Sequence, residues 1–387
     1  MAGDDRKRLV IGEFARRFGG EPILWVRAPG RVDLMGSHTD YNMGYVLTLS
    51  IDRDTWIAAR PRADRTVVVE SLGMDGRGMF DLDDFTRDSV APWTNYVRGV
   101  ARVLQDEGYR LHGFDGLIHS TVPLSSGLSS SAALEVATAT LFRVMGGWDV
   151  DPVKLALMCQ RAENEFVGMN CGILDQYTSA LGEAGCALRL DCRDLSSERV
   201  PVPDDVRIVI CDTQAARELT GSEYPERRAQ CEEGARLLAR FYPGVRALRD
   251  VTLAQFTAHE SDLPAVVARR CRFIIEENQR VLDLAAALPA GDRDEIDRLT
   301  SDSYAGARDL YEIVSPEMAA MMDAMLKGPG VIATRQAGAG FGGCMAAYVE
   351  DGQTRDFERH VRQAYAAATG IQPKVFPVQA APGAGPL

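Results

Sequence analysis

The amino-acid sequence predicts a mixed fold of the α/β or α+β class, on two observations. Strand-like and helix-like segments alternate along the chain, the pattern of helices that pack on sheets. The 387 residues are 46% hydrophobic and 25% charged, a composition typical of a globular chain with ample core. A chain of this length favours two domains. We place them at residues 1–200 and 201–369, because residues 193–198 break the periodicity.

The elements follow from the spacing of apolar residues. Alternation of apolar and polar residues predicts strands at residues 45–51, 56–60, 66–71, 117–120, 187–191, 207–212 and 345–350. Helical spacing predicts helices at residues 93–108, 131–145, 152–165, 224–241, 253–259, 266–287 and 293–310. The tail from about residue 370 resembles a strand that returns to the first domain, and its Ala/Gly/Pro-rich end, residues 380–387, is expected to fray.

Charge and composition exclude several classes of protein. The formal net charge of −12 argues against a nucleic-acid partner, whose phosphates require a basic surface. No run of 18 apolar residues predicts a membrane span, and the polar N-terminus lacks the apolar stretch of a secretory signal. The eight cysteines form no Cys-x-x-Cys pair, which indicates reduced thiols rather than a zinc site. We expect a cytoplasmic protein without a membrane partner.

A loop of small residues joins a strand to a helix at residues 123–132, Pro-Leu-Ser-Ser-Gly-Leu-Ser-Ser-Ser-Ala. Free N–H groups at the positive end of a helix suit an anion, above all a phosphate. The common nucleotide loop with its lysine is absent from the sequence, so backbone amides, serine hydroxyls and a metal would have to offset the phosphate charge. The alternative is an ordinary helix capped by a serine.

Two further segments are dense in polar groups. Residues 30–42 bring together side chains that suit a polyhydroxylated ligand, and the alternative is a polar turn with a locally satisfied histidine: Arg31, Asp33, Ser37, His38, Asp40, Tyr41 and Asn42. Asp175 follows a sharp turn at residues 168–172 and is either a helix N-cap or a functional acid. Glu163, before that turn, is a candidate ligand for Mg²⁺.

A second glycine-rich loop occupies residues 336–344, Gln-Ala-Gly-Ala-Gly-Phe-Gly-Gly-Cys. Its glycines allow the backbone to approach a ligand closely. The loop matches the dinucleotide fingerprint Gly-x-Gly-x-x-Gly in letters only, since it precedes a strand and opens no helix. A Rossmann site is therefore excluded.

These motifs, in this order, resemble the GHMP kinase superfamily and within it the galactokinase branch. Residues 30–42 resemble the galactokinase signature Gly-Arg-Val-Asn-Leu-Ile-Gly-Glu-His-Thr-Asp-Tyr-Asn. Residues 123–134 resemble the family's ATP loop, and residues 337–344 its third motif. Residues 93–100, 163–176 and 222–231 match as well, so that the resemblance extends from residue 24 to about 375.

The resemblance implies the two-domain GHMP fold with its active site in the cleft between the domains. It implies ATP-dependent phosphorylation of the anomeric C1 hydroxyl of galactose or a galactose-configured sugar. Asp175 would be the base or proton acceptor with Arg31 beside it, and Ser131 and Glu163 would bind Mg²⁺. ATP would contact Pro123, Ser125, Ser126, Gly127, Leu128, Ser129, Ser130, Ser131, Gly338 and Gly340. The sugar would contact Arg31, Ser37, His38, Asp40, Gly172, Asp175 and Tyr224. The expected partners are the sugar and Mg-ATP, for a monomer or small homo-oligomer.

Two positions depart from the family pattern. Ser37 stands where the family has a Glu that binds the C6 side of the sugar. The loss of that carboxylate suits a substrate with a different C6 end, such as galacturonate, L-arabinose or fucose, unless Ser37 and a water serve equally well. Asp33 replaces the usual Asn and is expected to orient Arg31. Two other functions remain open: a catalytically silent regulator that senses sugar and ATP, and a GHMP kinase for a non-sugar substrate, which the sugar-type residues 38–42 and 222–224 disfavour.

Overall fold

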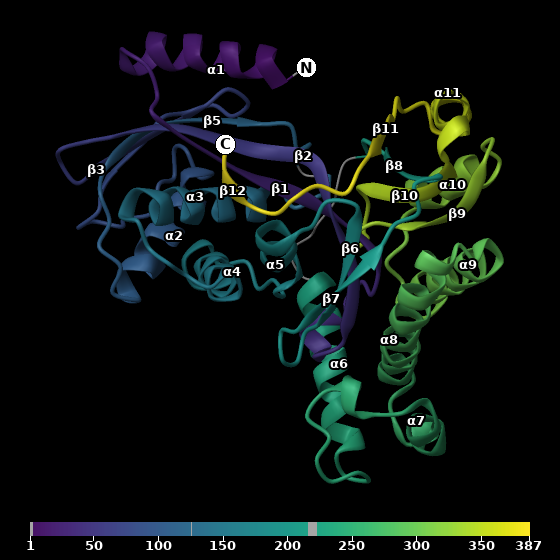
Figure 1. Ribbon diagram of the computed structural model, residues 1–387. Helices are drawn as coiled ribbons and strands as arrows, with labels where there is room; N and C mark the ends of the chain where they lie inside the picture. Colours follow the sequence, from purple (N-terminus) through teal and green to yellow (C-terminus); the bar gives the residue numbers. More distant parts are fainter. Residues whose placement is uncertain (1–2, 125, 216–222) are drawn as a thin grey trace.

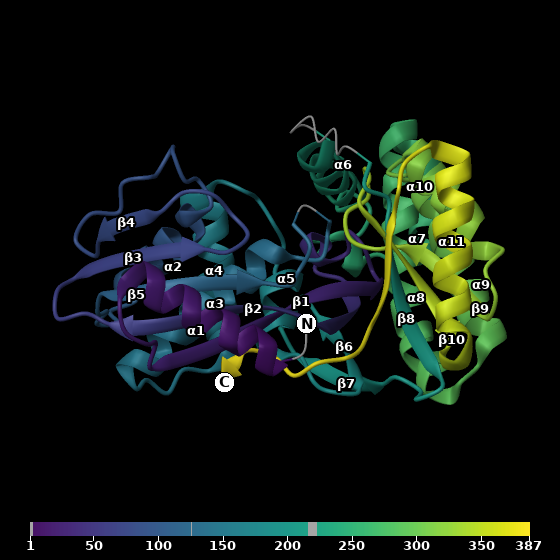
Figure 2. The same cartoon turned by 90° about the horizontal axis from the view of Figure 1, so that it is seen from above.

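The first sheet forms one half of the molecule in the computed structural model, which describes residues 3–124, 126–215 and 223–387 (Figures 1 and 2). Its strand order is β12-β1-β2-β5-β3-β4, with β6 paired to β2 and β7 paired to β6. The pair β3–β5 is parallel and the other pairs are antiparallel. The strands are β1 (Leu24–Met35), β2 (Tyr45–Pro61), β3 (Thr66–Ser71), β4 (Gly78–Asp81), β5 (Phe114–Ser120), β6 (Cys186–Asp191), β7 (Ser197–Pro201) and β12 (Gly385–Pro386).

Both faces of the first sheet are covered by helices, and the alternation of side chains along β2 shows why. Ile57 belongs to the core under the helices α2 and α3, whereas its neighbour Ala58 contacts the core formed with Phe14 of α1. The helix α1 lies alone on its face in Figure 1. The helices of this half are α1 (Gly3–Phe18), α2 (Thr94–Asp106), α3 (Ser130–Gly146), α4 (Pro152–Arg161) and α5 (Leu174–Leu181), with a π-helical turn η2 (Ala162–Val167).

The second sheet is antiparallel, in the order β11-β8-β10-β9. Its strands also alternate between two cores: Ile210 of β8 packs with Leu284 of α8, and Cys211 packs with Phe357 of α11. The strands are β8 (Val206–Asp212), β9 (Val331–Gln336), β10 (Cys344–Glu350) and β11 (Lys374–Val378). The helices are α6 (Glu223–Leu238), α7 (Leu253–His259), α8 (Ala265–Ala290), α9 (Arg293–Asp309), α10 (Pro316–Leu326) and α11 (Thr354–Thr369). Short 3-10 turns complete the chain: η1 (Asp40–Asn42), η3 (Leu248–Asp250), η4 (Glu260–Asp262) and η5 (Asp351–Gln353).

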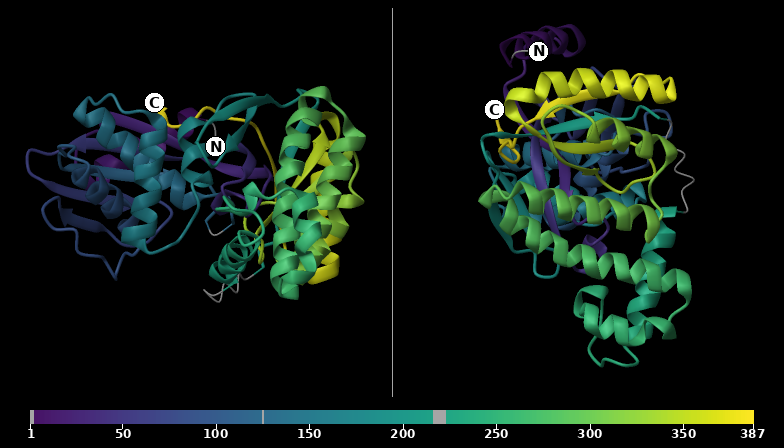
Figure 3. Two further views of the ribbon diagram at one scale, coloured as in Figure 1. Left: turned by 90° about the horizontal axis from the view of Figure 1, so that it is seen from below. Right: turned by 90° about the vertical axis from the view of Figure 1, so that its right-hand side faces the viewer.

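The two halves share a core and a crossing tail. Leu34 of β1 and Tyr348 of β10 lie in one hydrophobic cluster, where the Tyr348 hydroxyl donates to the Leu34 carbonyl at 3.2 Å. After β11 the chain crosses back toward β1, as Figure 3 shows. There the Ser50 hydroxyl donates to the Ala381 carbonyl at 2.6 Å, and the Leu387 N–H donates to the Trp25 carbonyl at 3.0 Å. The expected fraying of residues 380–387 is therefore wrong, because β1 and β2 satisfy this backbone.

The observed elements differ from the sequence-based prediction in three ways. The predicted strands 45–51 and 56–60 are one strand, β2, because Asp54 and Thr55 between them pair with β1 beyond a register shift. The predicted helix 152–165 ends as an α-helix at Arg161 and continues as η2. The prediction missed α1, β1, β4, β7, β9, α5, α10 and α11. The strand β7 belongs to the first sheet, and the next strand, β8, belongs to the second. We therefore keep a domain boundary near residues 195–205 as a proposal. Within the described residues, no helix combines the length and the apolar character needed to cross a membrane.

Candidate active site

The loop before α3 has the form that an anion site needs. Ser129 precedes the helix with φ 58° and ψ 51° and makes no side-chain cap, so the alternative of an ordinary capped helix is wrong. Its hydroxyl instead donates to Asp175 Oδ2 at 2.5 Å. The N–H groups of the first turn of α3, which includes Ser130 and Ser131, are therefore not taken by a side-chain cap. Ser125 lies outside the described residues.

The loop before α3 is held in place by hydrogen bonds within the loop and by one from β1. The Arg31 N–H donates to the Leu128 carbonyl at 3.1 Å, and the Leu128 side chain is fully buried in the core. The Ser126 hydroxyl donates to the Pro123 carbonyl at 2.8 Å. Within the predicted ATP-binding set, Leu128 therefore offers only its backbone to a ligand, and the hydroxyls of Ser126 and Ser129 already have protein acceptors.

The glycines of the other two motifs allow close approach to this loop. A Cβ on Gly30 would lie 2.6 Å from the Leu128 carbonyl oxygen, and one on Gly338 would lie 3.3 Å from the Gly127 oxygen. The Cys344 N–H donates to the Ser126 carbonyl at 3.1 Å. Gly340 faces elsewhere, since a Cβ there would lie 2.6 Å from the Ile313 oxygen. The structure thus brings Gly338 to the loop and leaves Gly340 against the turn between α9 and α10.

Arg31 and Asp175 meet across this loop. Arg31 Nε and Nη2 lie 2.7 and 2.6 Å from Asp175 Oδ1, and Nη1 donates to the Gly127 carbonyl at 2.6 Å. Burial by itself lowers the pKa of Arg31, but the charges of Asp175 and Asp33 outweigh it and raise that pKa. The Arg31 side chain is 7% exposed and the Asp175 side chain 26%, so Asp175 is the accessible member of the pair. It is the second residue of α5 and not its N-cap, which is Ile173.

Asp33 behaves as the sequence predicts. Its Oδ1 lies 3.2 Å from Arg31 Nε, in the interior of β1. Burial raises the pKa of Asp33, while the nearby Arg31 opposes this shift. Two carboxylates, those of Asp33 and Asp175, therefore approach Arg31 Nε and restrain its side chain.

Asp40 and Gly172 are in contact, and Tyr224 lies near them. A Cβ on Gly172 would lie only 1.7 Å from Asp40 Oδ2, so this carboxylate rests on the Gly172 backbone. Asp40 Oδ1 accepts the Tyr41 N–H at 2.9 Å. Burial, and next the charge of Asp175, raise the pKa of Asp40 to about 6. The Tyr224 ring, from α6, has its centroid 5.6 Å from that of Tyr41, the residue after Asp40. Burial and the charge of Asp40 raise the pKa of the Tyr224 hydroxyl.

His38 has protein partners on both ring nitrogens. Nε2 lies 2.8 Å from the Ala339 carbonyl, which only accepts, so Nε2 donates and Nδ1 accepts from the Tyr41 hydroxyl at 2.8 Å. Burial lowers the pKa of His38 to about 4, which keeps the ring neutral. A neighbouring ring, Tyr224, has its centroid 5.3 Å away. Both ring nitrogens of His38 are thus hydrogen-bonded within the protein, as the alternative of a locally satisfied histidine predicts. A sugar hydroxyl could bind to one of them only by replacing the Tyr41 hydroxyl or the Ala339 carbonyl.

Ser37 is buried in an ion-pair network that the sequence analysis missed. Ser37 is only 1% exposed, and its Oγ accepts a hydrogen bond from Arg335 Nη2 at 3.1 Å. Arg335 is fully buried and lies 3.5 Å from Glu277 of α8, which also accepts from Ser303 at 2.9 Å. Arg335 directly precedes the second glycine-rich loop, and this proximity was the available signal. The network couples Ser37 to the second sheet.

The predicted metal ligands also come together. Glu163, in η2, is 6% exposed and accepts from Gln176 Nε2 at 2.6 Å and from the Cys171 thiol at 3.3 Å. Burial, and next the charge of Asp175, raise the pKa of Glu163 to about 7, while the Ser131 hydroxyl, as a hydrogen-bond donor, opposes this shift. Among the described residues, no three His, Cys, Asp or Glu side chains form a cage for a metal.

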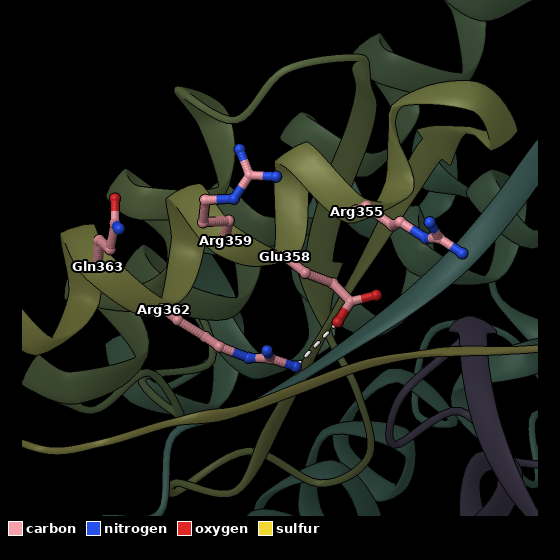
Figure 4. A pocket seen from close by; sticks show the side chains of 5 residues that line it. All are labelled: Arg355, Glu358, Arg359, Arg362 and Gln363. Carbon is pink, nitrogen blue, oxygen red and sulfur yellow. Dashed lines mark hydrogen bonds and ion pairs between the residues drawn. The ribbon is translucent and has the colours of Figure 1, made fainter.

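The described surface has hollows away from these motifs. One of about 430 Å³ lies on α11 and is lined by charged side chains, among which Arg362 donates to Glu358 at 2.8 Å (Figure 4). Another of about 510 Å³ lies at the end of α1, where Arg17 pairs with Glu70 at 2.5 Å. No residue predicted for the site lines either hollow.

Comparison with known proteins agrees with this geometry. The GHMP kinase N-terminal domain model matches residues 95–183, the GHMP kinase C-terminal model matches 284–367, and the galactokinase galactose-binding signature matches 12–61. A galactokinase of Roseiflexus sp. (strain RS-1) is 44% identical over 381 residues, which are 97% of each chain. The chain belongs to the galactokinase family of GHMP kinases. It is therefore a sugar kinase with the two-domain GHMP fold.

Solved structures support the same assignment. The crystal structure of Lactococcus lactis galactokinase complexed with galactose superposes with a TM-score of 0.94 and 33% identity, over 98% of this chain and 99% of that one. The mevalonate kinase of Methanococcus jannaschii, at 14% identity and a TM-score of 0.66 over 94% of this chain and 99% of that one, shares the fold alone. The catalytically silent regulator is thereby disfavoured, because the loop, Arg31 and Asp175 are all in place in this sugar kinase.

Replacing Gly172 by Ala tests the contact that supports Asp40. The new Cβ would lie 1.7 Å from Asp40 Oδ2, so the carboxylate must move. We expect KM for the sugar to rise by about 10- to 100-fold, the effect of losing a hydrogen bond to a charged group, roughly 1.5–3 kcal/mol. Steady-state kinetics measures the effect, and Gly352→Ala, whose Cβ meets no atom within 4 Å, is the control. An unchanged KM would separate Asp40 from sugar binding.

Proposed function

We propose that the chain transfers the γ-phosphoryl group of ATP to the C1 hydroxyl of galactose. The observation on which this depends most is the Arg31–Asp175 pair, at 2.6 Å, where the same guanidinium also donates to the Gly127 carbonyl of the loop before α3. Relatives named galactokinase, 42–44% identical over nearly the whole chain, support the choice of sugar. We further propose a monomer or small homo-oligomer in the cytoplasm, and the eight free cysteines favour this compartment.

We assign Mg²⁺ to Glu163 and Ser131, because the local charge favours a cation. Glu163 lies near the Asp175 carboxyl group, and burial, and next the charge of Asp175, raise the pKa of Glu163. The nearby Arg31 is already paired with Asp175 and Asp33. When bound, Mg²⁺ would neutralise the phosphate oxygens and orient the γ-phosphoryl group.

The residues of the chain divide the remaining work. The Asp175 carboxylate takes the proton from the C1 hydroxyl of the sugar. The C1 oxygen forms a bond to the γ-phosphorus as the bond from that phosphorus to ADP breaks. Arg31 holds Asp175 and the Gly127 carbonyl together, so the proton acceptor and the phosphate loop keep one geometry. Backbone N–H groups at the start of α3 hold the phosphates, while Asp40, Gly172 and Tyr224 orient the sugar.

A substrate panel tests the proposed reaction and the role of Ser37. We expect Mg-ATP-dependent turnover of galactose among galactose, L-arabinose, fucose, galacturonate and N-acetylgalactosamine, measured as ADP release and as the sugar 1-phosphate. Ser37→Glu puts a carboxylate beside Arg335 and is expected to shift the ranking further toward galactose. Ser37→Ala controls for loss of the hydroxyl. Absence of turnover with every sugar would refute the kinase proposal, and an unchanged ranking in Ser37→Glu would refute the role of Ser37.

Asp175→Ala removes the proposed proton acceptor. We expect kcat to fall by about 10²–10⁴-fold, the usual contribution of a positioned base. Nucleotide binding, measured by calorimetry with ADP, should remain close to wild type, because the backbone at residues 126–131 is unchanged. Activity like that of the wild type would remove Asp175 from the mechanism.

The pH dependence of galactose use follows from Asp40. Its raised pKa, about 6, means that the carboxyl becomes neutral as the pH falls through that value. A neutral carboxyl is a weaker acceptor for a sugar hydroxyl, so kcat/KM for galactose should decline below about pH 6. Asp40→Asn, which does not titrate, should lower kcat/KM and remove this inflection. The same inflection in Asp40→Asn would assign it to another group.

A further inference from the structure

The side-chain amide of Gln176 joins two carboxyl groups. Gln176 is fully buried on α5, directly after Asp175. Its Nε2 donates to Glu163 Oε2 at 2.6 Å and to Glu135 Oε2 at 2.9 Å. An amide nitrogen has two hydrogens, so these two bonds use both of them. Glu135 belongs to α3, is fully buried, and takes no part in the proposed reaction.

Two oxygens in this group have no hydrogen-bond partner. They are Glu135 Oε1 and Gln176 Oε1, both shielded from solvent. Each is the second oxygen of a planar group, and the two groups are already joined through Gln176 Nε2 and Glu135 Oε2. If Glu135 is ionised, both oxygens are acceptors and neither has a donor, which is costly in a buried position.

A proton on Glu135 would turn one of its oxygens from an acceptor into a donor. In a coplanar pair of a carboxylic acid and an amide, the acid O–H donates to the amide oxygen while the amide N–H donates to the acid carbonyl. These two hydrogen bonds close a ring, and the second N–H of the amide points away from it. In Gln176 this is the N–H that reaches Glu163 at 2.6 Å.

Local charge supports the same state. Burial, and next the charge of Glu163, raise the pKa of Glu135 well above its usual range. A neutral Glu135 removes one negative charge from a buried region that also holds Glu163 and Asp175.

We propose that Glu135 is a neutral carboxylic acid paired with Gln176, and that this pair is a positioning device for Glu163. The inference rests on the proposed function, in which Glu163 binds Mg²⁺. The Gln176 N–H holds one oxygen of Glu163, which fixes the direction in which the other oxygen faces the Ser131 side. Partners of this kind, one bond removed from a metal, typically change metal affinity by about 10–100-fold when lost.

Three variants separate the neutral pair from other roles of Glu135. Glu135→Gln keeps the shape and can both donate to and accept from Gln176. Glu135→Met keeps the length and removes the pair. Thr138→Val alters an equally buried polar residue one turn along α3, whose hydroxyl donates to the Leu134 carbonyl at 2.8 Å, and controls for general damage to the helix.

The first readout is the Mg²⁺ dependence of the full-length enzyme. We expect Glu135→Gln and Thr138→Val to need a Mg²⁺ concentration within about threefold of wild type for half-maximal rate. Glu135→Met should need about 10-fold more or beyond, with KM for galactose nearly unchanged. Impairment of Glu135→Gln equal to that of Glu135→Met would overturn the proposal, because it would show that the carboxylate charge is required.

The second readout needs neither activity nor metal. Infrared spectra of the metal-free protein at about pH 8, far above the ordinary Glu pKa of about 4.3, should contain the carbonyl band of a protonated carboxyl group. The difference spectrum against Glu135→Gln should assign that band to Glu135. Loss of no such band on substitution would overturn the proposal, even if Glu135→Met fails to fold. If wild type turns over no sugar while the band is present, the proposed function fails and the neutral pair stands.

Discussion

The ion pair between Arg31 and Asp175 holds three separate parts of the chain in one geometry. Arg31 lies in the interior of β1, Asp175 is in the first turn of α5, and the same guanidinium donates to the Gly127 carbonyl of the loop before α3. Because a guanidinium offers several donors in a rigid plane, one side chain fixes both the proposed proton acceptor and the phosphate loop. Asp33 also approaches Arg31 Nε and restrains its side chain. The relative position of acceptor and phosphate therefore depends on a buried charge balance.

Around this pair the structure concentrates acidic groups and keeps them from solvent. Burial raises the pKa of Asp40 to about 6 and that of Glu163 to about 7. Such an arrangement is costly in an empty site and favourable once cations and hydroxyl donors enter it. Mg²⁺ and a polyhydroxylated sugar are ligands of that kind. Two positive groups nearby already have partners within the protein. Arg31 pairs with Asp175, and Arg335 contacts Ser37 and Glu277.

The sequence-based prediction was most accurate where local pattern and tertiary environment agree. The predicted helix at residues 253–259 and the strand at 66–71 match α7 and β3. In β3 the apolar pattern reports burial directly, because residues 67–69 are all buried, whereas α7 buries Phe256 and leaves Leu253 exposed. The prediction missed β1, whose Pro29, Gly30, Arg31 and Asp33 do not resemble a buried strand. There, pairing with β2 and the charge partners from α5 and the loop override local propensity. The short α5 was hidden for a similar reason, since Asp175 and Gln176 serve the site rather than a regular apolar face.

The order and spacing of the motifs were enough to determine the family, the kinase chemistry and the residues that meet at the loop, because these depend on residue type and local backbone form. The tertiary structure alone decided which atoms are still available. It turned the Ser129 hydroxyl to Asp175, gave both nitrogens of His38 protein partners, and enclosed Ser37 beside Arg335. The partners in these contacts lie far apart in the chain, apart from Tyr41 beside His38. Hydrogen-bond saturation in a packed interior is a property of the whole fold, which is why local pattern did not reveal it.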